Sequence, residues 1–318
     1  MSTAVEVHSV TKQYGALVAV ENLSFAVGAG EILGVLGPNG AGKTTAIRVL
    51  TTIFTATHGT FAVAGVPHTK PTEIRRRIGV LPESAGFPER QTGEEYLRYH
   101  ARLYGSTRTG ARRSAQALLD EVGLGNRRRS LIATYSRGMR QRLGIARALV
   151  NEPRVVFLDE PTLGLDPAGQ RQILSTVLQI ARERGATVLL STHLLTEVEE
   201  VCSRVLILNH GRIVAEGTVS EVTSLAAAPR SMRLRVATDD MDRAIVALNT
   251  DPGVEAVLHA DGQPGSLVVT LTPADGRPDE KVMNDAIRAL LNGGVPVLAF
   301  ELERARLSDA FLAMTKDA

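Results

Sequence analysis

The sequence predicts an α/β protein with a larger domain built on a mixed sheet and a small α+β domain after it. Three observations predict this class. A glycine-rich loop at residues 37–44 follows the apolar run Ile32–Leu36 and precedes a helical pattern. Two more short apolar runs, residues 155–158 and 187–190, each lead directly into polar residues, as buried parallel strands do. Beyond residue 230, expected strands and helices follow the order β-α-β-β-α-β.

The glycine-rich loop fits the pattern G-x-x-x-x-G-K-[ST], which is typical of phosphate binding. Its glycines allow backbone N–H groups to turn toward an anion, and the N-terminus of the following helix favours negative charge. We expect Lys43 to hold the β- and γ-phosphates of a nucleotide and Thr44 to bind Mg²⁺. The alternative is a glycine-rich turn without a ligand. The residues expected to contact the nucleotide here are Gly37, Pro38, Asn39, Gly40, Ala41, Gly42, Lys43, Thr44 and Thr45.

Two carboxylates follow the strand predicted at residues 155–158. Asp159 is expected to bind Mg²⁺, and Glu160 to orient or deprotonate the water that attacks the γ-phosphate. Ligands bind at the carboxyl ends of parallel strands, which favours this role over a merely solvated acidic pair. His193 follows the strand at residues 187–190 and is expected to sense the γ-phosphate together with Glu160. Taken alone, such a histidine would more often be an exposed polar residue.

The order of these motifs resembles the ATP-binding subunits of ABC transporters over about the first two thirds of the chain. The resemblance implies ATP and Mg²⁺ as cofactors and ATP hydrolysis as the activity. It also implies a core with an antiparallel β subdomain and a helical subdomain at about residues 84–150. Tyr14 matches the aromatic residue that stacks on adenine, an interaction that needs no base-specific hydrogen bond.

The same resemblance assigns two more loops. Residues 136–139 match the signature loop, which caps the γ-phosphate of ATP bound to a second subunit, and residues 163–166 match a loop at the dimer interface. Independently of the resemblance, Ser136 is a good N-cap for the helical pattern after it, so an ordinary capped helix is the alternative. The residues that these loops add to the nucleotide site are Ser136, Gly138 and Asp166.

Four positions depart from the usual pattern of the family. Glu83 replaces a glutamine, and its carboxylate would reach Mg²⁺ or the attacking water. Arg137 and Met139 replace a glycine and a glutamine of the signature loop, and Leu163 replaces a serine. These variants resemble the drug-exporter, daunorubicin-resistance type of ATPase, which carries a C-terminal accessory domain. They leave the contacts of Glu83 and Arg137 open.

The resemblance implies an exporter motor with two partners. One is a second copy of the chain or a related ATPase subunit, and the other is a separate transmembrane permease that contacts the surface near residues 83–98. A soluble ATPase of the same type, acting on ribosomes or DNA, is the alternative. The chain shows one ATPase unit and no long heptad coil, which favours the exporter.

Composition agrees with a cytosolic enzyme, and the resemblance implies a peripheral location at the cytoplasmic face of the cell membrane. The net charge is +2 from 36 basic and 34 acidic residues, so nucleic-acid binding is not expected. A single cysteine, Cys202, excludes an intramolecular disulfide. No apolar run approaches the roughly 20 residues that a membrane span needs, and no signal-like N-terminus is present. We therefore expect the permeation path to belong to another chain.

The expected domains are residues 1–225, which would bind ATP, and residues 230–318, which would form a ferredoxin-like accessory domain. Ala226, Ala227, Ala228 and Pro229 mark a plausible boundary, because proline disfavours a continued helix. No catalytic pattern occurs in the second domain. We expect it to stabilise the dimer or to contact the transmembrane subunit, with a small-molecule regulatory module as the alternative.

Overall fold

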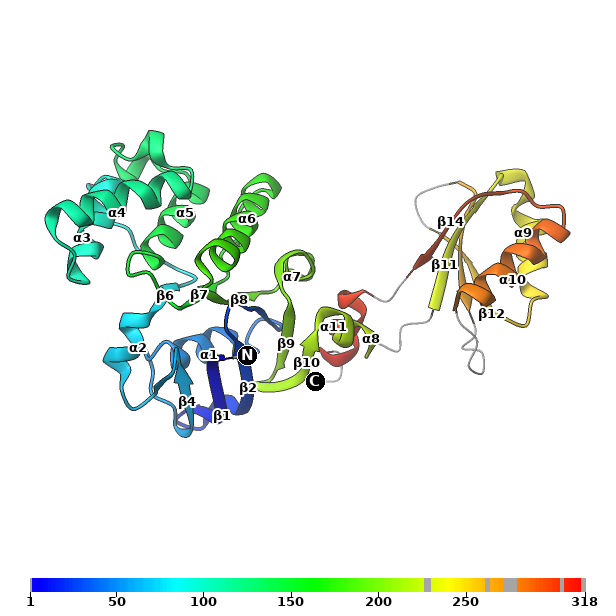
Figure 1. The fold of residues 1–318 in the computed structure, drawn as a ribbon. Coiled ribbons are helices and arrows are strands. Elements are labelled where there is room, and N and C mark those ends of the chain that lie inside the picture. The colour runs from blue at the N-terminus through cyan, green and yellow to red at the C-terminus, as the bar shows by residue number, and fades with distance from the viewer. Residues whose placement is uncertain (1, 226–229, 261–263, 272–278, 304–305, 316–318) are drawn as a thin grey trace. The chain divides into compact units, whose positions relative to one another are not determined.

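The computed structural model describes residues 2–225, 230–260, 264–271, 279–303 and 306–315 (Figure 1). The chain forms two compact units. One runs to Val222 and also includes the chain from Phe311 onward, whereas the other spans Thr223–Ala310.

The expected domain of residues 230–318 and the observed grouping differ from Phe311 onward. The helix α11 (Leu307–Thr315) follows the β-α-β-β-α-β series and is not part of it. Its residues up to Ala310 group with the second unit, and from Phe311 onward the chain groups with the first. The functional assignment of the two units stays a prediction.

The first unit is organised by a six-stranded sheet in the order β10-β9-β3-β8-β7-β6. All neighbouring strands pair in parallel except β10, which is antiparallel to β9. Every residue of β3, β7 and β8 is buried, because helices and a second sheet cover the faces of this sheet; this explains their unbroken apolar sequences. The strands are β3 (Ile32–Leu36), β6 (Ile78–Leu81), β7 (Val155–Asp159), β8 (Thr187–Thr192), β9 (Arg204–Asn209) and β10 (Arg212–Thr218).

A second, antiparallel sheet has the order β2-β1-β4-β5. Its inward residues, such as Val5, Val27 and Val63, share one core with α1 (Lys43–Leu50) and with Leu33 of β3. The glycine-rich loop therefore connects a buried strand to a helix that is packed between the two sheets. The strands are β1 (Thr3–Tyr14), β2 (Leu17–Gly28), β4 (His58–Val63) and β5 (Val66–Pro67).

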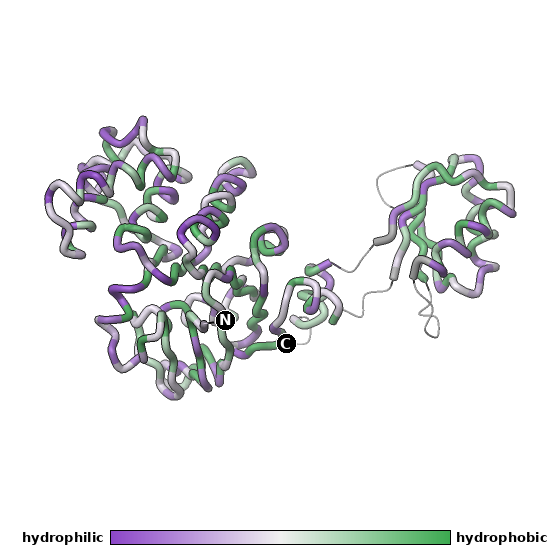
Figure 2. The backbone as a smooth tube through the Cα atoms, viewed as in Figure 1, coloured by the Kyte–Doolittle hydropathy of each residue, from purple (hydrophilic) through white to green (hydrophobic). Residues whose placement is uncertain are grey.

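Helices from the middle of the chain form a second core around Leu97, Leu119 and Leu143, and hydrophobic positions recur along them at helical spacing (Figure 2). Thr92 begins α3 with a capping box, in which Glu95 pairs with the Thr92 backbone and side chain. Tyr104, which follows the last residue of this helix, is about half exposed. The helices and 3₁₀ turns here are α2 (Pro71–Arg77), α3 (Gly93–Leu103), α4 (Arg108–Glu121), η1 (Gly125–Arg127), η2 (Ile132–Thr134) and α5 (Arg137–Ala148).

Three more helices follow along the chain before the second unit, and the last of them crosses the boundary at Val222. Asp166 caps the longest, and a capping box formed by Thr218 and Glu221 begins the shortest. Within the described residues, no helix combines the length and apolar composition that a bilayer span requires. The helices are α6 (Pro167–Arg184), α7 (Leu195–Val201) and α8 (Val219–Ser224).

The second unit has the predicted β-α-β-β-α-β order. Its four strands are all antiparallel in the order β12-β13-β11-β14, the arrangement of a ferredoxin-like fold. One face of the sheet packs against both helices, around Leu234, Leu248, Val269 and Leu290. The elements are β11 (Arg230–Val236), η3 (Thr238–Asp240), α9 (Met241–Asn249), β12 (Val254–His259), β13 (Ser266–Leu271), α10 (Asp279–Asn292) and β14 (Val297–Glu303).

Candidate active site

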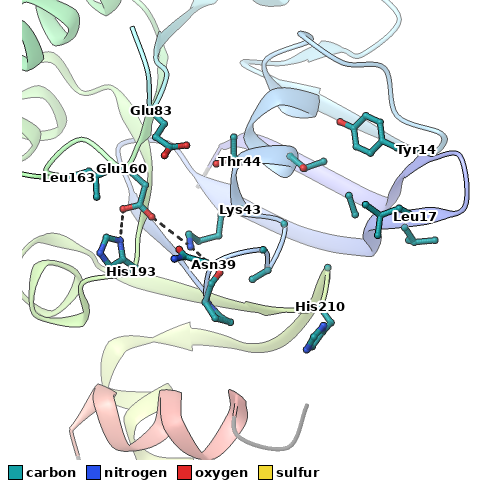
Figure 3. Close-up of a pocket in the computed structure, with 18 residues that line it drawn as sticks. Tyr14, Leu17, Asn39, Lys43, Thr44, Glu83, Glu160, Leu163, His193 and His210 are labelled. Atoms are coloured by element: carbon teal, nitrogen blue, oxygen red, sulfur yellow. Dashed lines mark hydrogen bonds and ion pairs between the residues drawn. The ribbon is translucent and has the colours of Figure 1, made fainter.

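A cleft of about 710 Å³ lies at the carboxyl ends of the main-sheet strands (Figure 3). It gathers the turn between β1 and β2, the glycine-rich loop after β3, the ends of β6, β7 and β8, and the turn between β9 and β10. Segments far apart in the sequence meet here because parallel strands all end at the same edge of the sheet. The lining residues are Tyr14, Leu17, Val18, Ala19, Pro38, Asn39, Gly40, Ala41, Gly42, Lys43, Thr44, Thr45, Glu83, Glu160, Leu163, His193, His210 and Gly211.

The glycine-rich loop has a shape that other residues would distort. Gly40 and Gly42 have φ angles of 84° and 100°, which side chains disfavour. A Cβ at Gly42 would also lie 2.6 Å from the Ala19 carbonyl, and one at Gly37 would lie 2.5 Å from the Leu208 carbonyl. The loop is therefore held tightly against β2 and β9.

Lys43 is the first residue of α1, and its side chain is buried within the loop. Its Nζ donates to the carbonyl oxygens of Gly37 at 2.7 Å and Pro38 at 3.3 Å. These bonds place a cation at the centre of the loop. The first helical bond joins the Ala46 N–H to the Gly42 carbonyl, so the N–H groups before it lie at the free N-terminus of the helix. Cation and helix end together form an anion site.

Glu160 lies at the centre of a chain of polar contacts. Its Oε2 lies 2.8 Å from His193 Nδ1, and its Oε1 lies 3.6 Å from Lys43 Nζ (Figure 3). The carboxylate is almost fully buried, whereas His193 is about 40% exposed. Glu160 also has a φ of 48°, a left-handed conformation that is strained for a residue other than glycine. The structure thus brings together Lys43, Glu160 and His193, the three residues predicted to contact the phosphates and the attacking water.

Asp159 lies beneath Thr44 and beside Ser191. Its Oδ1 accepts hydrogen bonds from Thr44 Oγ1 at 3.2 Å and from Ser191 Oγ at 2.5 Å. A hydroxyl and a carboxylate oxygen are the hard ligands that Mg²⁺ prefers. The described residues contain no group of three His, Cys, Asp or Glu that could hold a metal ion by themselves. The pair therefore fits a magnesium ion that takes its other ligands from phosphates and water.

Two more predicted residues lie at the margin of the cleft. The Tyr14 ring is 40% exposed and packs edge-to-face on Phe54 with 5.8 Å between centroids, while Lys12 Nζ lies 4.9 Å from the Tyr14 ring. Glu83 follows β6, is exposed, and lines the same cleft as Glu160 (Figure 3). The adenine contact of Tyr14 and the metal contact of Glu83 stay predictions.

Ser136, Gly138 and Asp166 do not line this cleft. They border a separate cavity of about 450 Å³ at the N-termini of α5 and α6. Ser136 Oγ accepts from the Met139 N–H at 3.3 Å, as the predicted N-cap does, and Asp166 Oδ1 caps α6 through the Gly169 N–H at 3.0 Å. Within one subunit, the expected nucleotide contacts therefore fall into two places.

Sequence reasoning missed two parts of the site. Ser191, which is fully buried, donates to Asp159 and accepts the Glu160 N–H at 3.0 Å; its place directly before Thr192 and His193 was the available signal. The second part is the turn at Gly211, between β9 and β10. Its N–H donates to the Ala41 carbonyl at 3.0 Å, which ties this turn to the phosphate loop.

Comparison with known proteins identifies the family of this chain. The family model described as "ABC transporter" matches residues 20–163. The "Daunorubicin/doxorubicin resistance ATP-binding protein DrrA" of Streptomyces peucetius is 38% identical over 98% of this chain and 92% of its own. The "Doxorubicin resistance ATP-binding protein DrrA" of Mycobacterium tuberculosis is 34% identical over 99% of this chain and 94% of its own.

Among solved structures, the "Structure of ATP binding subunit of ABC transporter" matches at 34% identity with a TM-score of 0.63. It covers 70% of this chain and 93% of that one. This match agrees with the predicted α/β fold and with the loop, strand-end carboxylates and histidine that meet in the cleft. The chain belongs to the ABC transporter family, as an ATP-binding subunit that hydrolyses ATP.

Proposed function

We propose that this chain powers the export of a drug-like, antibiotic, lipid or related molecule through a separate transmembrane subunit. The observation that carries the proposal is the contact chain from Lys43 through Glu160 to His193 in the cleft. The daunorubicin- and doxorubicin-resistance relatives, aligned over nearly the whole chain, support the class of substrate.

We propose a separate task for each polar or aromatic residue of the cleft. Lys43 binds the β- and γ-phosphates, because its ammonium is held at the centre of the loop. Glu160 accepts a proton from the attacking water or orients it, since its buried carboxylate lies beside the γ-phosphate position. His193 contacts Glu160 and is exposed enough to reach a phosphate oxygen. Tyr14 stacks on the adenine.

Thr44 and Asp159 are proposed to hold the magnesium ion, with Glu83 as a further oxygen near it. When bound, the ion would neutralise charge that develops on the phosphates. Ser191 keeps Asp159 oriented through its 2.5 Å hydrogen bond. Orientation by a second group of this kind is a common feature of metal sites.

We further propose that two ATPase subunits bind two nucleotides between them. Ser136, Gly138 and Asp166 border a cavity that shares no lining residue with the Lys43 cleft. They are therefore available to the nucleotide of a second subunit, either a copy or a related chain. The N-terminus of α5, capped by Ser136, suits an anion.

The transmembrane partner is proposed to contact the surface near residues 83–98 and the adjacent end of α3, from the cytoplasmic side. A groove of about 270 Å³ at this end of α3 is lined by Ile53, His100 and Tyr104, among others. Ile53 is 57% exposed, and Leu103, the last residue of α3, is 64% exposed. Exposed apolar side chains around a groove favour a protein partner over solvent.

Two substitutions test the chemistry. Lys43→Ala is expected to abolish tight ATP binding, because it removes the cation in the loop. Glu160→Gln is expected to retain ATP binding, to slow hydrolysis by about 10² or more and to trap an ATP-loaded dimer. Nucleotide binding, phosphate release and sedimentation with ATP measure these effects. Hydrolysis by Glu160→Gln at the parent rate would refute the base assignment.

The partner is tested with the same variant. Tagged Glu160→Gln protein is purified from its native cells with ATP and mild detergent, and co-purified proteins are identified by mass spectrometry. Lys43→Ala serves as the matched control, since it should not form the ATP-loaded state. A stoichiometric membrane protein retained only by Glu160→Gln is the expected result. Ribosomal proteins or nucleic acid in its place would support the soluble alternative.

A further inference from the structure

Arg137, one of the departures from the family pattern, lies against the loop that follows Glu160. A Cβ built on Gly164 would lie 2.5 Å from Arg137 Cζ, 2.7 Å from Nη1 and 2.8 Å from Nη2. The flat face of the guanidinium therefore covers Gly164, whose φ of 70° is itself suited to glycine. Only a residue without a side chain leaves room for the arginine in this place.

The neighbouring residues extend this contact along the loop. A Cβ on Gly138 would lie 3.8 Å from Leu165 Cδ2, so the first turn of α5 packs on two successive loop residues. Among the described residues, Arg137 has no ion-pair partner within 4.0 Å. Packing on Gly164 thus accounts for its position.

The loop beneath Arg137 is tied directly to the proposed base. The Leu163 N–H donates to the Glu160 carbonyl at 3.2 Å, and the Leu165 N–H donates to the Thr162 carbonyl at 3.1 Å. Leu163 lines the Lys43 cleft, whereas Gly164 lines the second cavity. Two adjacent residues of one loop therefore line two different cavities.

We propose that Arg137 is a positioning residue for ATP hydrolysis: by packing on Gly164, it fixes the loop of residues 160–166 and with it the carboxylate of Glu160. This inference rests on the proposed role of Glu160 as the base. Its physical reason is the strained conformation of Glu160, because a residue with a φ of 48° keeps its place only when its surroundings restrain it. The contact joins the N-terminus of α5 to the catalytic strand end.

A double-mutant cycle tests the contact. Arg137→Ala is expected to lower kcat about fivefold to tenfold with KM unchanged within about twofold, because the loop loses its restraint while the phosphate loop is untouched. Gly164→Ala should lower kcat by at least about tenfold, since the new Cβ displaces the guanidinium. The double variant should be no slower than Gly164→Ala, because both changes break one contact. Arg137→Lys should behave like Arg137→Ala, since an ammonium lacks the flat face.

Two control variants separate this effect from general damage. Gly185→Ala places a side chain at a φ of 62° in open space, so it should reproduce the backbone strain of Gly164→Ala without loss of kcat. Arg129→Ala removes another exposed arginine and should leave the rate unchanged. Amide hydrogen exchange gives a readout besides activity: the peptide spanning residues 160–166 should exchange faster in Arg137→Ala, and Arg129→Ala should match the parent.

Three outcomes would overturn the inference. Arg137→Ala with a parental kcat would show that the contact has no effect on hydrolysis. A raised KM, with losses that multiply in the double variant, would show that Arg137 contacts a nucleotide directly. Unchanged exchange at residues 160–166 would show that it does not restrain the loop. Failure of the proposed function gives a different result. Hydrolysis by Glu160→Gln at the parental rate would refute the role of Glu160 as the base, whereas the faster exchange of residues 160–166 in Arg137→Ala would still be observed.

Discussion

Replacing Ser191 with alanine removes one hydroxyl that holds both strand-end carboxylate residues. Ser191 Oγ donates to Asp159 Oδ1 at 2.5 Å and accepts the Glu160 N–H at 3.0 Å, and the side chain is fully buried. The Glu160 N–H keeps a second acceptor, the Ser191 carbonyl at 3.1 Å, so the substitution leaves this donor paired. Asp159 keeps only its longer bond from Thr44 at 3.2 Å. The main effect should therefore fall on Asp159.

The expected size follows from the type of bond lost. A hydrogen bond to a charged group contributes about 1.5–3 kcal/mol. If the same restraint acts in the transition state, a loss of about 1.4 kcal/mol slows hydrolysis about tenfold. Because Asp159 is proposed to hold Mg²⁺, the concentration of Mg²⁺ needed for half-maximal rate should rise as well. ATP affinity without Mg²⁺ should change little, since Lys43 is untouched.

The assay measures phosphate release against Mg²⁺ concentration, together with thermal unfolding. Ser203→Ala is a matched control: its hydroxyl donates to the Ile32 carbonyl at 3.1 Å, away from the cleft. It should reduce stability by about 0.5–1.5 kcal/mol and leave the Mg²⁺ dependence unchanged. If Ser191→Ala retained the parental rate and Mg²⁺ dependence, the proposed orientation of Asp159 would be wrong.

Two further predictions concern Glu83 and Cys202. Glu83→Gln should keep hydrolysis within about tenfold of the parent, since it alters one modest interaction; complete loss in a steady-state assay would show that the carboxylate is catalytic. Burial raises the pKa of the Cys202 thiol from 9.0 to about 12. Iodoacetamide at about pH 8 should therefore label it only after denaturation. Because the folded pKa is the higher one, the contribution of Cys202 to stability is present below pH 9 and is lost as pH rises from 9 toward 12, which urea titrations against pH would detect.

The core of the site was predictable because parallel strands end at a common edge. Lys43, Asp159 and His193 each follow or end a buried apolar run, so the sequence alone placed them together. The same reasoning gave the order of elements in the second unit, whose strands and helices alternate with clear periodicity. Strong local patterns linked to a simple topology are the most predictable features of a fold.

What the sequence did not reveal depends on contacts between distant segments. Ser191 was passed over because its place directly before Thr192 and His193 does not by itself show that its hydroxyl is buried against Asp159. The Gly211 turn contacts Ala41 across about 170 residues of chain, a pairing that no short pattern encodes. The final helix is divided between the two units at Phe311, a grouping that no local pattern in residues 307–315 marks.

The departures from the family pattern become connected once the structure is considered. Arg137 and Leu163 are separated in the sequence, and each replaces a small residue of the usual pattern. In the structure, Leu163 lines the Lys43 cleft, and the next residue, Gly164, lies under Arg137. One of the larger side chains, Leu163, thus belongs to this short loop, and the other, Arg137, packs against it. The loop begins with the strained Glu160. Arg137 can restrain this loop, which a glycine at position 137 could not do.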